Sequence, residues 1–312
     1  MKKAGIIGGS GFIGSYVTKL FLGNGFDVKV SSTDISTEAK YRHLMLFEGA
    51  DRLHIAELDV RDKEALRDFV KDCDIVIHAG TPFQLDVKDP QTELFDPTVN
   101  GTRNFLEVIK QTSGIEKVVI VASVASYNAN FSMPAADRTP NDTFDENDEK
   151  FNSVDCHPYG QAKFLANQTV ERFLADNPDL GFEISSVSPT FVIGKSLSDR
   201  EDSTSGGMQF LFKNKIAPND FVQMLYDRDV DFAMVDVRDV ATAIYKSATT
   251  RNIHGKNYLL SSETYAISDI SRMLNLENPK NNAKVIYRND LAKRNLGVEF
   301  RSAKETLHFY SS

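Results

Sequence analysis

The chain has 312 residues, of which 41% are hydrophobic and 10% aromatic, so it can build a sizeable packed core and is neither disordered nor fibrous. Its 36 basic and 44 acidic side chains give a net charge of −8, whereas a generic nucleic-acid binder carries the opposite sign. No apolar run approaches the ~20 residues that cross a bilayer, and we expect no signal peptide, because the first residues lead into a strand without its apolar stretch and cleavage site. We therefore expect a cytoplasmic globular protein that binds neither nucleic acid nor membrane. Two cysteines and six scattered histidines predict no disulfide framework and no metal site.

Through the first two-thirds of the chain, short apolar strands alternate with longer amphipathic helices. Strands are expected at residues 4–7, 28–31, 53–56, 75–78, 118–122 and 183–188, and helices at 12–22, 40–47, 63–70, 98–111 and 159–175. Near-continuous apolar strands separated by helices indicate βαβ units and a doubly wound parallel sheet covered on both faces. Residues 128–158 are irregular and acidic, and residues 195–207 are polar and rich in Gly and Ser, which predicts two surface loops, the second of them mobile.

The first expected strand leads directly into GGSGFIG and then into a helix. Gly8, Gly11 and Gly14 supply the tight turn, the close backbone approach and the close helix–strand packing that a pyrophosphate-binding turn needs. Phe12 and Ile13 open the helix, whose free N–H groups and positive dipole end face the phosphates. A glycine pattern alone is weak, but this strand–turn–helix context predicts a dinucleotide site.

The end of the second expected strand decides between NAD and NADP, because an acidic side chain there binds the free ribose and a 2′-phosphate excludes it. The strand ends at Ser32 and is followed by Thr33 and Asp34. In one interpretation Asp34 is the NAD carboxylate. In the other, Ser32 and Thr33 bind a 2′-phosphate with help from Lys40 or Arg42, and we favour this NADP reading.

Tyr159 and Lys163 are four residues apart on an expected helix and therefore share one face. An ammonium group beside a phenol favours the phenolate and would lower the tyrosine pKa toward the range useful for proton transfer. The spacing is common on helix surfaces, and its position after the glycine turn gives it weight. Ser123 stands at the carboxyl end of the fifth strand, where open α/β sheets place ligands. We favour it over Ser126 as the hydroxyl that binds a carbonyl oxygen.

In this order, the motifs resemble the extended short-chain dehydrogenase/reductase superfamily and its NAD-dependent epimerase/dehydratase family. The resemblance covers nearly the whole chain and rests on the glycine turn, Asp59-Val60, His78-Ala79-Gly80, Asn100-Gly101-Thr102, Ser123, the Tyr159/Lys163 pair, Pro189 and residues 235–241. Stretches 73–83, 99–102, 144–146 and 188–194 are most similar to the branch of dihydroflavonol, cinnamoyl-CoA and aldehyde/ketone reductases.

The resemblance implies further cofactor contacts: Asp59 and Val60 near the adenine, Ala79 and Gly80 along the dinucleotide, Lys163 on the nicotinamide ribose, and the Pro189 backbone beside the nicotinamide. This branch usually uses NADPH and holds its phosphate with an arginine after the second strand and a lysine on the next helix. Here Thr33 stands at the arginine position and Lys40 matches the lysine. NAD-using epimerases of the superfamily end that strand with an aspartate, where this chain has Ser32.

The activity implied is NAD(P)H-dependent reduction of a small aldehyde or ketone, with Tyr159 as general acid, Lys163 lowering its pKa and Ser123 positioning the carbonyl. The alternative is an NAD-dependent nucleotide-sugar epimerase or dehydratase, although residues 123–126 lack the acidic residue of the family's dehydratases. We predict an NAD(P)-binding Rossmann domain at 1–190 and a mostly substrate-binding domain at 191–312, with segments near 235–260 returning to the first.

Substrate specificity is expected in residues 195–232 and in the loops near Phe83 and Tyr127. The aromatic residues between 210 and 232 are expected chiefly in the core. The resemblance also makes a homodimer possible, because helix pairing is common in the superfamily.

Overall fold

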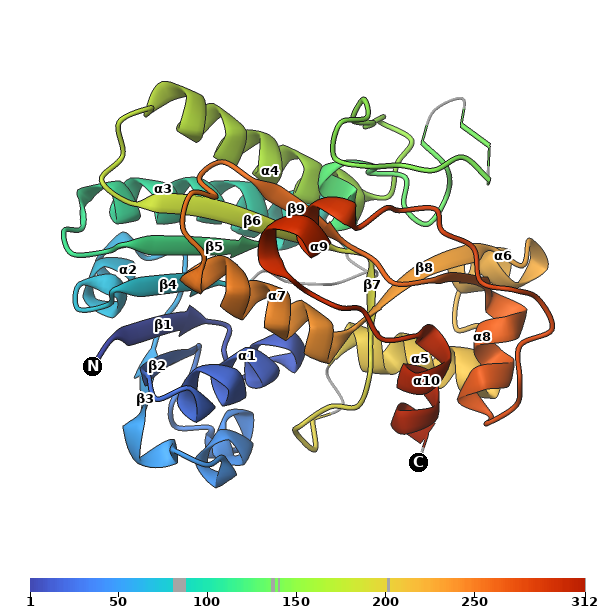
Figure 1. Ribbon diagram of the computed structural model, residues 1–312, viewed down its shortest axis with the longest axis horizontal. Helices are drawn as coiled ribbons and strands as arrows, with labels where there is room; N and C mark the ends of the chain where they lie inside the picture. The colour runs from blue at the N-terminus through green and yellow to red at the C-terminus, as the bar shows by residue number, and fades with distance from the viewer. Residues whose placement is uncertain (81–87, 136–137, 140, 201–202, 312) are drawn as a thin grey trace.

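The computed structural model describes residues 1–80, 88–135, 138–139, 141–200 and 203–311. Figure 1 shows a large sheet between two layers of helices, with a smaller group of strands and helices beside it. The strands of the large sheet are β1 (Lys3–Ile7), β2 (Asp27–Ser32), β3 (Leu53–Glu57), β4 (Ile75–His78), β5 (Lys117–Val121), β6 (Glu183–Pro189) and β9 (Asn257–Leu260). Their order is β3-β2-β1-β4-β5-β6-β9, and every neighbouring pair is parallel. The first six follow the Rossmann order, so the expected fold class is confirmed.

Helices bury both faces of this sheet. α1 (Phe12–Gly23) and α7 (Val237–Thr249) share one apolar cluster with the strands on one face. α2 (Lys63–Val70), α3 (Gly101–Gln111) and α4 (Pro158–Asp176) share another on the opposite face. A strand covered on both sides has no solvent-facing side chains, and all four residues of β4 are buried. This double burial explains the near-continuous apolar strands of the sequence.

The smaller sheet is built around β8 (Asp231–Asp236), which pairs in parallel with β7 (Phe191–Ile193) and antiparallel with β10 (Thr264–Ala266). Four helices enclose a cluster of aromatic, methionine and aliphatic side chains with it: α5 (Thr204–Asn214), α6 (Asp220–Asp227), α8 (Ile267–Leu274) and α10 (Ala303–Ser311). Between these elements the chain crosses back to the large sheet, to which it adds α7 and β9, and α9 (Asp290–Leu296) then packs beside β9. The proposed domain boundary at residue 190 remains a prediction.

Three expected elements differ from the structure. Residues 40–47 form no α-helix but lie in two 3₁₀ turns, η1 (Glu38–Lys40) and η2 (Arg42–Leu46), because Leu44 is the only buried residue of the two turns and no apolar stripe holds a longer helix. The helix expected from 98 begins earlier, as a π-helix η4 (Gln91–Asn100) that contains Pro97, a residue without an N–H group to donate. The loop expected to reach residue 207 ends sooner, because the Ser203 hydroxyl accepts from the Gly206 N–H and caps α5.

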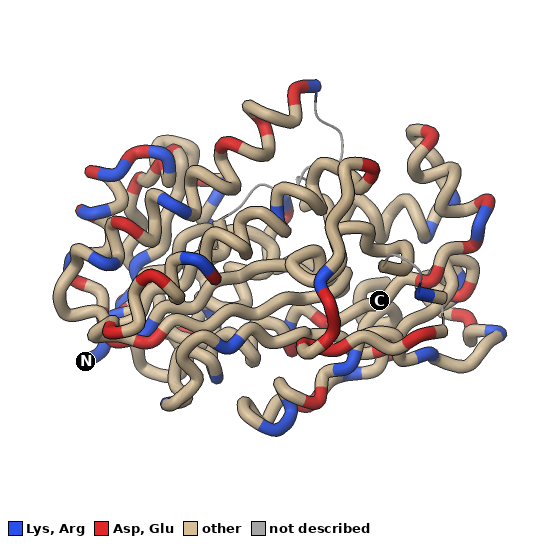
Figure 2. The backbone as a smooth tube through the Cα atoms, turned by 90° about the horizontal axis from the view of Figure 1, so that it is seen from above, with Lys and Arg blue, Asp and Glu red and all other residues tan. Residues whose placement is uncertain are grey.

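Along the backbone, the positions of Lys and Arg and those of Asp and Glu are interspersed and lie mostly at the periphery of the molecule (Figure 2). No helix in the part of the chain that the structure describes has the length and apolar character needed to span a bilayer. The remaining short turns are η3 (Ala50–Arg52), which precedes β3, and η5 (Val124–Ser126), which follows β5.

Candidate active site

The glycine turn packs directly against the end of β4. Gly8 has φ +78°, in the left-handed region that favours glycine, and a Cβ atom there would lie 2.8 Å from Gly80 Cα. A Cβ atom on Gly14 would lie 2.0 Å from the Gly8 carbonyl oxygen. The structure thus brings Gly8, Gly14 and Gly80 together at the carboxyl edge of the sheet, and a side chain at any of them would fill the space beside the turn.

The N-terminus of α1 is open to an anion. Gly11 precedes the helix and has no side chain to cap it, and no acidic residue lies in the first turn. The N–H groups of such a first turn have no partner within the helix and, with the helix dipole, attract negative charge. Phe12 and Ile13 occupy this turn. The residues present therefore fit the pyrophosphate of a dinucleotide.

At the end of β2, Thr33 and Lys40 are in contact, since the Lys40 Nζ donates to the Thr33 Oγ1 at 3.1 Å. Ser32 is buried, and its hydroxyl donates to the Asp34 carbonyl at 3.0 Å. The Asp34 carboxylate accepts from the backbone N–H and the hydroxyl of Ser36, at 2.9 and 2.6 Å. These bonds, with a third from Thr37, lower the pKa of Asp34 to about 2. The carboxylate is thus held in its own turn, while a hydroxyl and an ammonium group meet beside it.

The other expected cofactor residues lie along the same edge of the sheet. Asp59 follows β3 and pairs with Arg61 at 2.7 Å, and hydrogen bonds from Arg61 lower the pKa of this carboxyl. Val60 faces the N-terminal end of α3, and the Ala79 N–H donates to the Ile7 carbonyl at 2.9 Å. Residues 81–83, the end of the stretch similar to the reductase branch, lie outside the described residues, and Phe83 with them.

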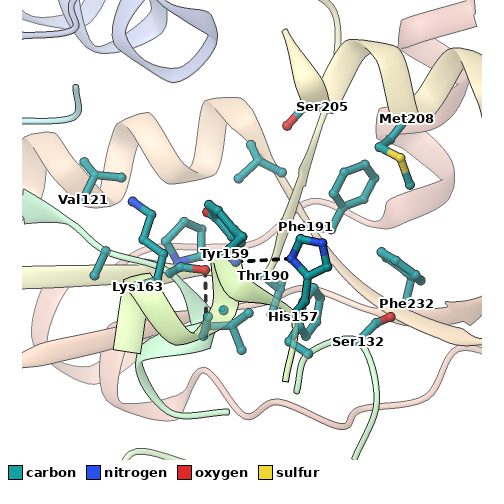
Figure 3. Close-up of a pocket in the computed structure, with 18 of the residues that line it drawn as sticks. Val121, Ser132, His157, Tyr159, Lys163, Thr190, Phe191, Ser205, Met208 and Phe232 are labelled. Carbon is teal, nitrogen blue, oxygen red and sulfur yellow. Dashed lines mark hydrogen bonds between the residues drawn. The ribbon is translucent and has the colours of Figure 1, made fainter. Parts of the chain in front are cut away.

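Tyr159 and Lys163 both lie on α4, with the Lys163 Nζ 5.9 Å from the centroid of the Tyr159 ring. The start of α4 is fixed by His157, whose Nδ1 accepts from the Tyr159 N–H at 3.2 Å, and by Gly160, where a Cβ atom would lie 2.1 Å from the Ala129 carbonyl oxygen. Only a glycine at position 160 lets α4 approach the loop after β5 this closely. Figure 3 shows Tyr159 between the side chains of Lys163 and His157.

Ser123 and Lys163 are buried, with exposed fractions of 9% and 8%. Ser123 caps η5 by accepting from the Ala125 N–H at 3.2 Å, and its hydroxyl also hydrogen-bonds the side chain of Tyr159. The three predicted residues Ser123, Tyr159 and Lys163 therefore converge, although the first comes from the β5 edge and the others from α4.

Burial controls the pKa values of this group. It raises the pKa of Tyr159 well above its usual value, and the hydrogen bond with Ser123 acts in the opposite direction. Burial lowers the pKa of Lys163 to about 8. The net shift of the Tyr159 pKa is therefore upward and not downward as expected, because desolvation penalises the phenolate more than the neighbouring groups stabilise it.

The converging residues open onto a cavity of about 170 Å³, lined on one side by Ile13, Ala79 and Pro189 and on the other by apolar side chains. These are Phe131, Phe191, Met208, Phe221 and Phe232, and His157, Thr190, Ser132 and Ser205 add polar atoms. Figure 3 shows Phe191, Met208 and Phe232 beyond His157 on the side away from Lys163.

The region 195–232, where substrate specificity was expected, supplies Met208, Phe221 and Phe232. Sequence reasoning did not single out Phe131, Phe191 or Met208, because the lining is assembled from the β5–α4 loop, β7, α5, α6 and β8. Of the aromatic residues between 210 and 232, Phe221 and Phe232 line the cavity, whereas Phe212 is fully buried and Phe210 is exposed. Tyr127 is buried and donates to the Asn257 carbonyl at 2.8 Å, so it supports the fold beside the cavity.

The fold and the glycine turn are those of a Rossmann-type α/β protein. The chain belongs to the NAD dependent epimerase/dehydratase family, whose model matches residues 4–261. The family expected from the sequence motifs is thereby confirmed.

The curated relatives include reductases. The chain is 28% identical to the cinnamoyl-CoA reductase of Medicago truncatula over 274 residues, which are 86% of this chain and 78% of the relative. It is 27% identical to the NADPH-dependent methylglyoxal reductase of Saccharomyces cerevisiae over 336 aligned positions, covering 97% and 95% of the two chains.

Solved structures show the same fold. The yeast methylglyoxal/isovaleraldehyde reductase complexed with NADPH matches with a TM-score of 0.80 at 24% identity, over 99% of this chain and 97% of that one. A UDP-glucose-4-epimerase from Stenotrophomonas maltophila with bound NAD matches with a TM-score of 0.77 at 17% identity, over 100% and 97%. Both reductases and epimerases therefore share this architecture.

Proposed function

We propose that this protein is an NADPH-dependent reductase of small aldehydes or ketones. One observation carries the proposal: a single cavity joins Ile13 of the nucleotide-binding turn to Tyr159 and Lys163 and continues into an apolar chamber. Such a chamber places a carbonyl carbon between a dinucleotide and a proton donor. The curated relatives support the same chemistry, since they include NADPH-dependent reductases.

When bound, the cofactor supplies the hydride. The residues proposed to hold it are Gly8, Gly11, Phe12, Ile13 and Gly14 at the pyrophosphate, Ser32, Thr33 and Lys40 at the 2′-phosphate, Asp59 and Val60 at the adenine, Ala79 and Gly80 along the dinucleotide, and Tyr159, Lys163 and Pro189 at the nicotinamide end. The contact between Thr33 and Lys40 favours NADP over NAD, because two hydrogen-bond donors there suit a phosphate.

Tyr159 donates a proton to the carbonyl oxygen of the substrate. Its raised pKa keeps the phenol protonated at neutral pH, which is the form a general acid needs. Ser123 hydrogen-bonds the same oxygen and holds it near the phenol. The Lys163 ammonium beside the ring stabilises the phenolate that forms when the proton leaves.

The residues that line the cavity also favour one class of substrate. Five aromatic or methionine side chains surround the chamber beyond Tyr159, which favours a carbonyl compound with an apolar substituent. A nucleotide sugar presents many hydroxyl and phosphate groups, whereas beyond Tyr159 the described lining offers no cationic side chain and only the polar groups of Ser132, His157, Thr190 and Ser205. The epimerase alternative is therefore less favoured. The domain division, a homodimer and a cytoplasmic location remain predictions from the sequence.

The test is a turnover assay with NADPH and NADH against a panel of aliphatic and aromatic aldehydes and ketones. We expect stoichiometric loss of NADPH and formation of the alcohol, with NADH used more slowly. Interconversion of UDP-sugars without net consumption of cofactor, and no reduction of any carbonyl, would establish the epimerase alternative instead.

A further inference from the structure

The segment that follows β7 crosses from the small sheet to the nucleotide-binding edge of the large one. Its second residue, Lys195, accepts a hydrogen bond at its carbonyl from the Tyr16 hydroxyl of α1, at 2.8 Å. Five residues later, the Arg200 Nη1 donates to the Lys40 carbonyl at 3.2 Å. Residues 160 positions apart in the sequence therefore meet at the end of β2.

The Arg200 guanidinium lies among the groups that surround this edge. Burial of His43 is the main cause of its lowered pKa, and the positive charge of Arg200 is the next cause. The His43 Nε2 lies 2.8 Å from the Ser15 hydroxyl of α1. The negative charge of Asp199 raises the pKa of His43. Arg200 is thus near both η1, which carries Lys40, and η2, which carries His43 and packs on α1.

We propose that Arg200 binds the 2′-phosphate of NADPH together with Lys40, and is a residue that determines cofactor specificity. This inference rests on the proposed function. A 2′-phosphate carries close to two negative charges, and a guanidinium can bind two of its oxygens while a lysine supplies a compact charge. In a chain of net charge −8, such binding depends on local cations. Here two of them converge from distant parts of the sequence.

The acidic residue that follows β2 does not oppose this assignment. The Asp34 carboxylate is engaged by Ser36 and Thr37 in its own turn. The pyrophosphate, the other anionic part of the cofactor, is served by the glycine turn and the start of α1. Arg200 is therefore assigned to the ribose phosphate and not to the diphosphate.

The test measures binding without the nicotinamide. Adenosine 2′,5′-bisphosphate and 5′-AMP differ by the 2′-phosphate alone, and calorimetric titration gives a Kd for each. We expect Arg200→Gln to weaken bisphosphate binding about 10- to 100-fold, the range of a charge-assisted hydrogen-bonded pair, and to change 5′-AMP binding less than twofold. Arg200→Lys should retain part of the preference. Arg103→Gln, an exposed arginine on α3, is the matched control and should change neither.

Each other outcome contradicts the inference in a recognisable way. Equal weakening of both nucleotides by Arg200→Gln would assign the residue to the diphosphate or to folding. A loss of bisphosphate binding in Arg42→Gln but not in Arg200→Gln would assign the phosphate to the neighbouring arginine of η2. If the unaltered protein binds both nucleotides equally, the NADP preference of the proposed function is itself wrong. If it prefers the bisphosphate and Arg200→Gln keeps that preference, only the role of Arg200 fails.

Discussion

The Lys163 Nζ lies 5.9 Å from the centre of the Tyr159 ring, one helical turn further along α4, and Lys163 is buried while Tyr159 is half-buried. Burial favours the neutral phenol and also weakens the hold of Lys163 on its proton. In the proposed mechanism, Tyr159 therefore keeps its proton until a substrate oxygen is bound, and the Lys163 ammonium stabilises the phenolate that forms afterwards. This differs from a tyrosine that is already ionised by its neighbour.

Replacing Tyr159 by Phe removes the proposed acid and keeps the ring. We expect turnover to fall roughly 10²- to 10⁴-fold, the usual contribution of a positioned acid, with the Kd for NADPH nearly unchanged. Steady-state kinetics and a fluorescence titration of NADPH measure the two quantities. Tyr245→Phe, which keeps a ring packed on Phe21 far from the cavity, is the control. Comparable turnover of Tyr159→Phe and the unaltered protein would remove Tyr159 from the mechanism.

The pH dependence of kcat/KM should reflect the titration of the Lys163 ammonium group. Because its pKa is lowered to about 8, kcat/KM for reduction should fall as pH rises through about 8, where the ammonium that stabilises the phenolate is lost. Tyr159, with a raised pKa, stays protonated there. Lys163→Met should have low activity without this descending limb, whereas the exposed Lys110→Met should keep it. A limb that persists in Lys163→Met belongs to another group.

The lowered pKa of Lys163 also predicts that stability rises with pH in the range where activity falls. The folded protein binds the Lys163 proton more weakly than the unfolded chain, whose lysine has the ordinary pKa of 10.5. Below pH 8 the protonated form therefore opposes folding, and this cost disappears as pH rises from about 8 to 10.5. Relative to that of Lys163→Met, the unfolding free energy of the unaltered protein should therefore rise over that interval. Urea unfolding at several pH values measures it, and a constant difference would contradict the shift.

Substitutions at two glycines of α1 distinguish an effect on the cofactor-binding turn from a general effect on the helix. A Cβ atom on Gly14 would lie 2.0 Å from the Gly8 carbonyl oxygen, whereas one on Gly23 would meet nothing within 4 Å. Gly14→Ala should weaken NADPH binding at least tenfold and lower thermal stability, because the turn must move. Gly23→Ala should leave binding unchanged. If Gly14→Ala binds NADPH normally, the turn does not hold the pyrophosphate as proposed.

The aromatic chamber should favour apolar substrates. Phe221 is half-buried on α6 and lines the cavity beside His157. Phe221→Ala should lower kcat/KM for benzaldehyde about tenfold, as expected from lost apolar contact, and change that for acetaldehyde less than twofold. Phe210→Ala, at an exposed position of α5 that does not line the cavity, should affect neither. Equal losses for the two aldehydes in Phe221→Ala would show that the chamber does not hold the substituent.

The fold was largely readable from the sequence, because its signals are local. Each strand of the Rossmann order is a short apolar run, and the turn at residues 8–14 combines a strand, glycines and a helix start within one stretch. The spacing of Tyr159 and Lys163 is also local, since one helical turn places them on one face. Where local signals are weak, prediction failed: residues 40–47 have no buried stripe and form 3₁₀ turns.

By itself, the sequence determined the family, the parallel sheet and the glycine turn, and it led to the prediction that Ser123, Tyr159 and Lys163 form the site. Tertiary structure alone decided what surrounds them, because desolvation and long-range contact depend on the packed chain. Burial on α4 raises the Tyr159 pKa where the spacing had predicted a lowering. The aromatic and methionine part of the cavity lining is gathered from the β5–α4 loop, β7, α5, α6 and β8. Arg200 reaches Lys40 only because β7 directs the chain back across α1. No spacing in the sequence encodes that encounter.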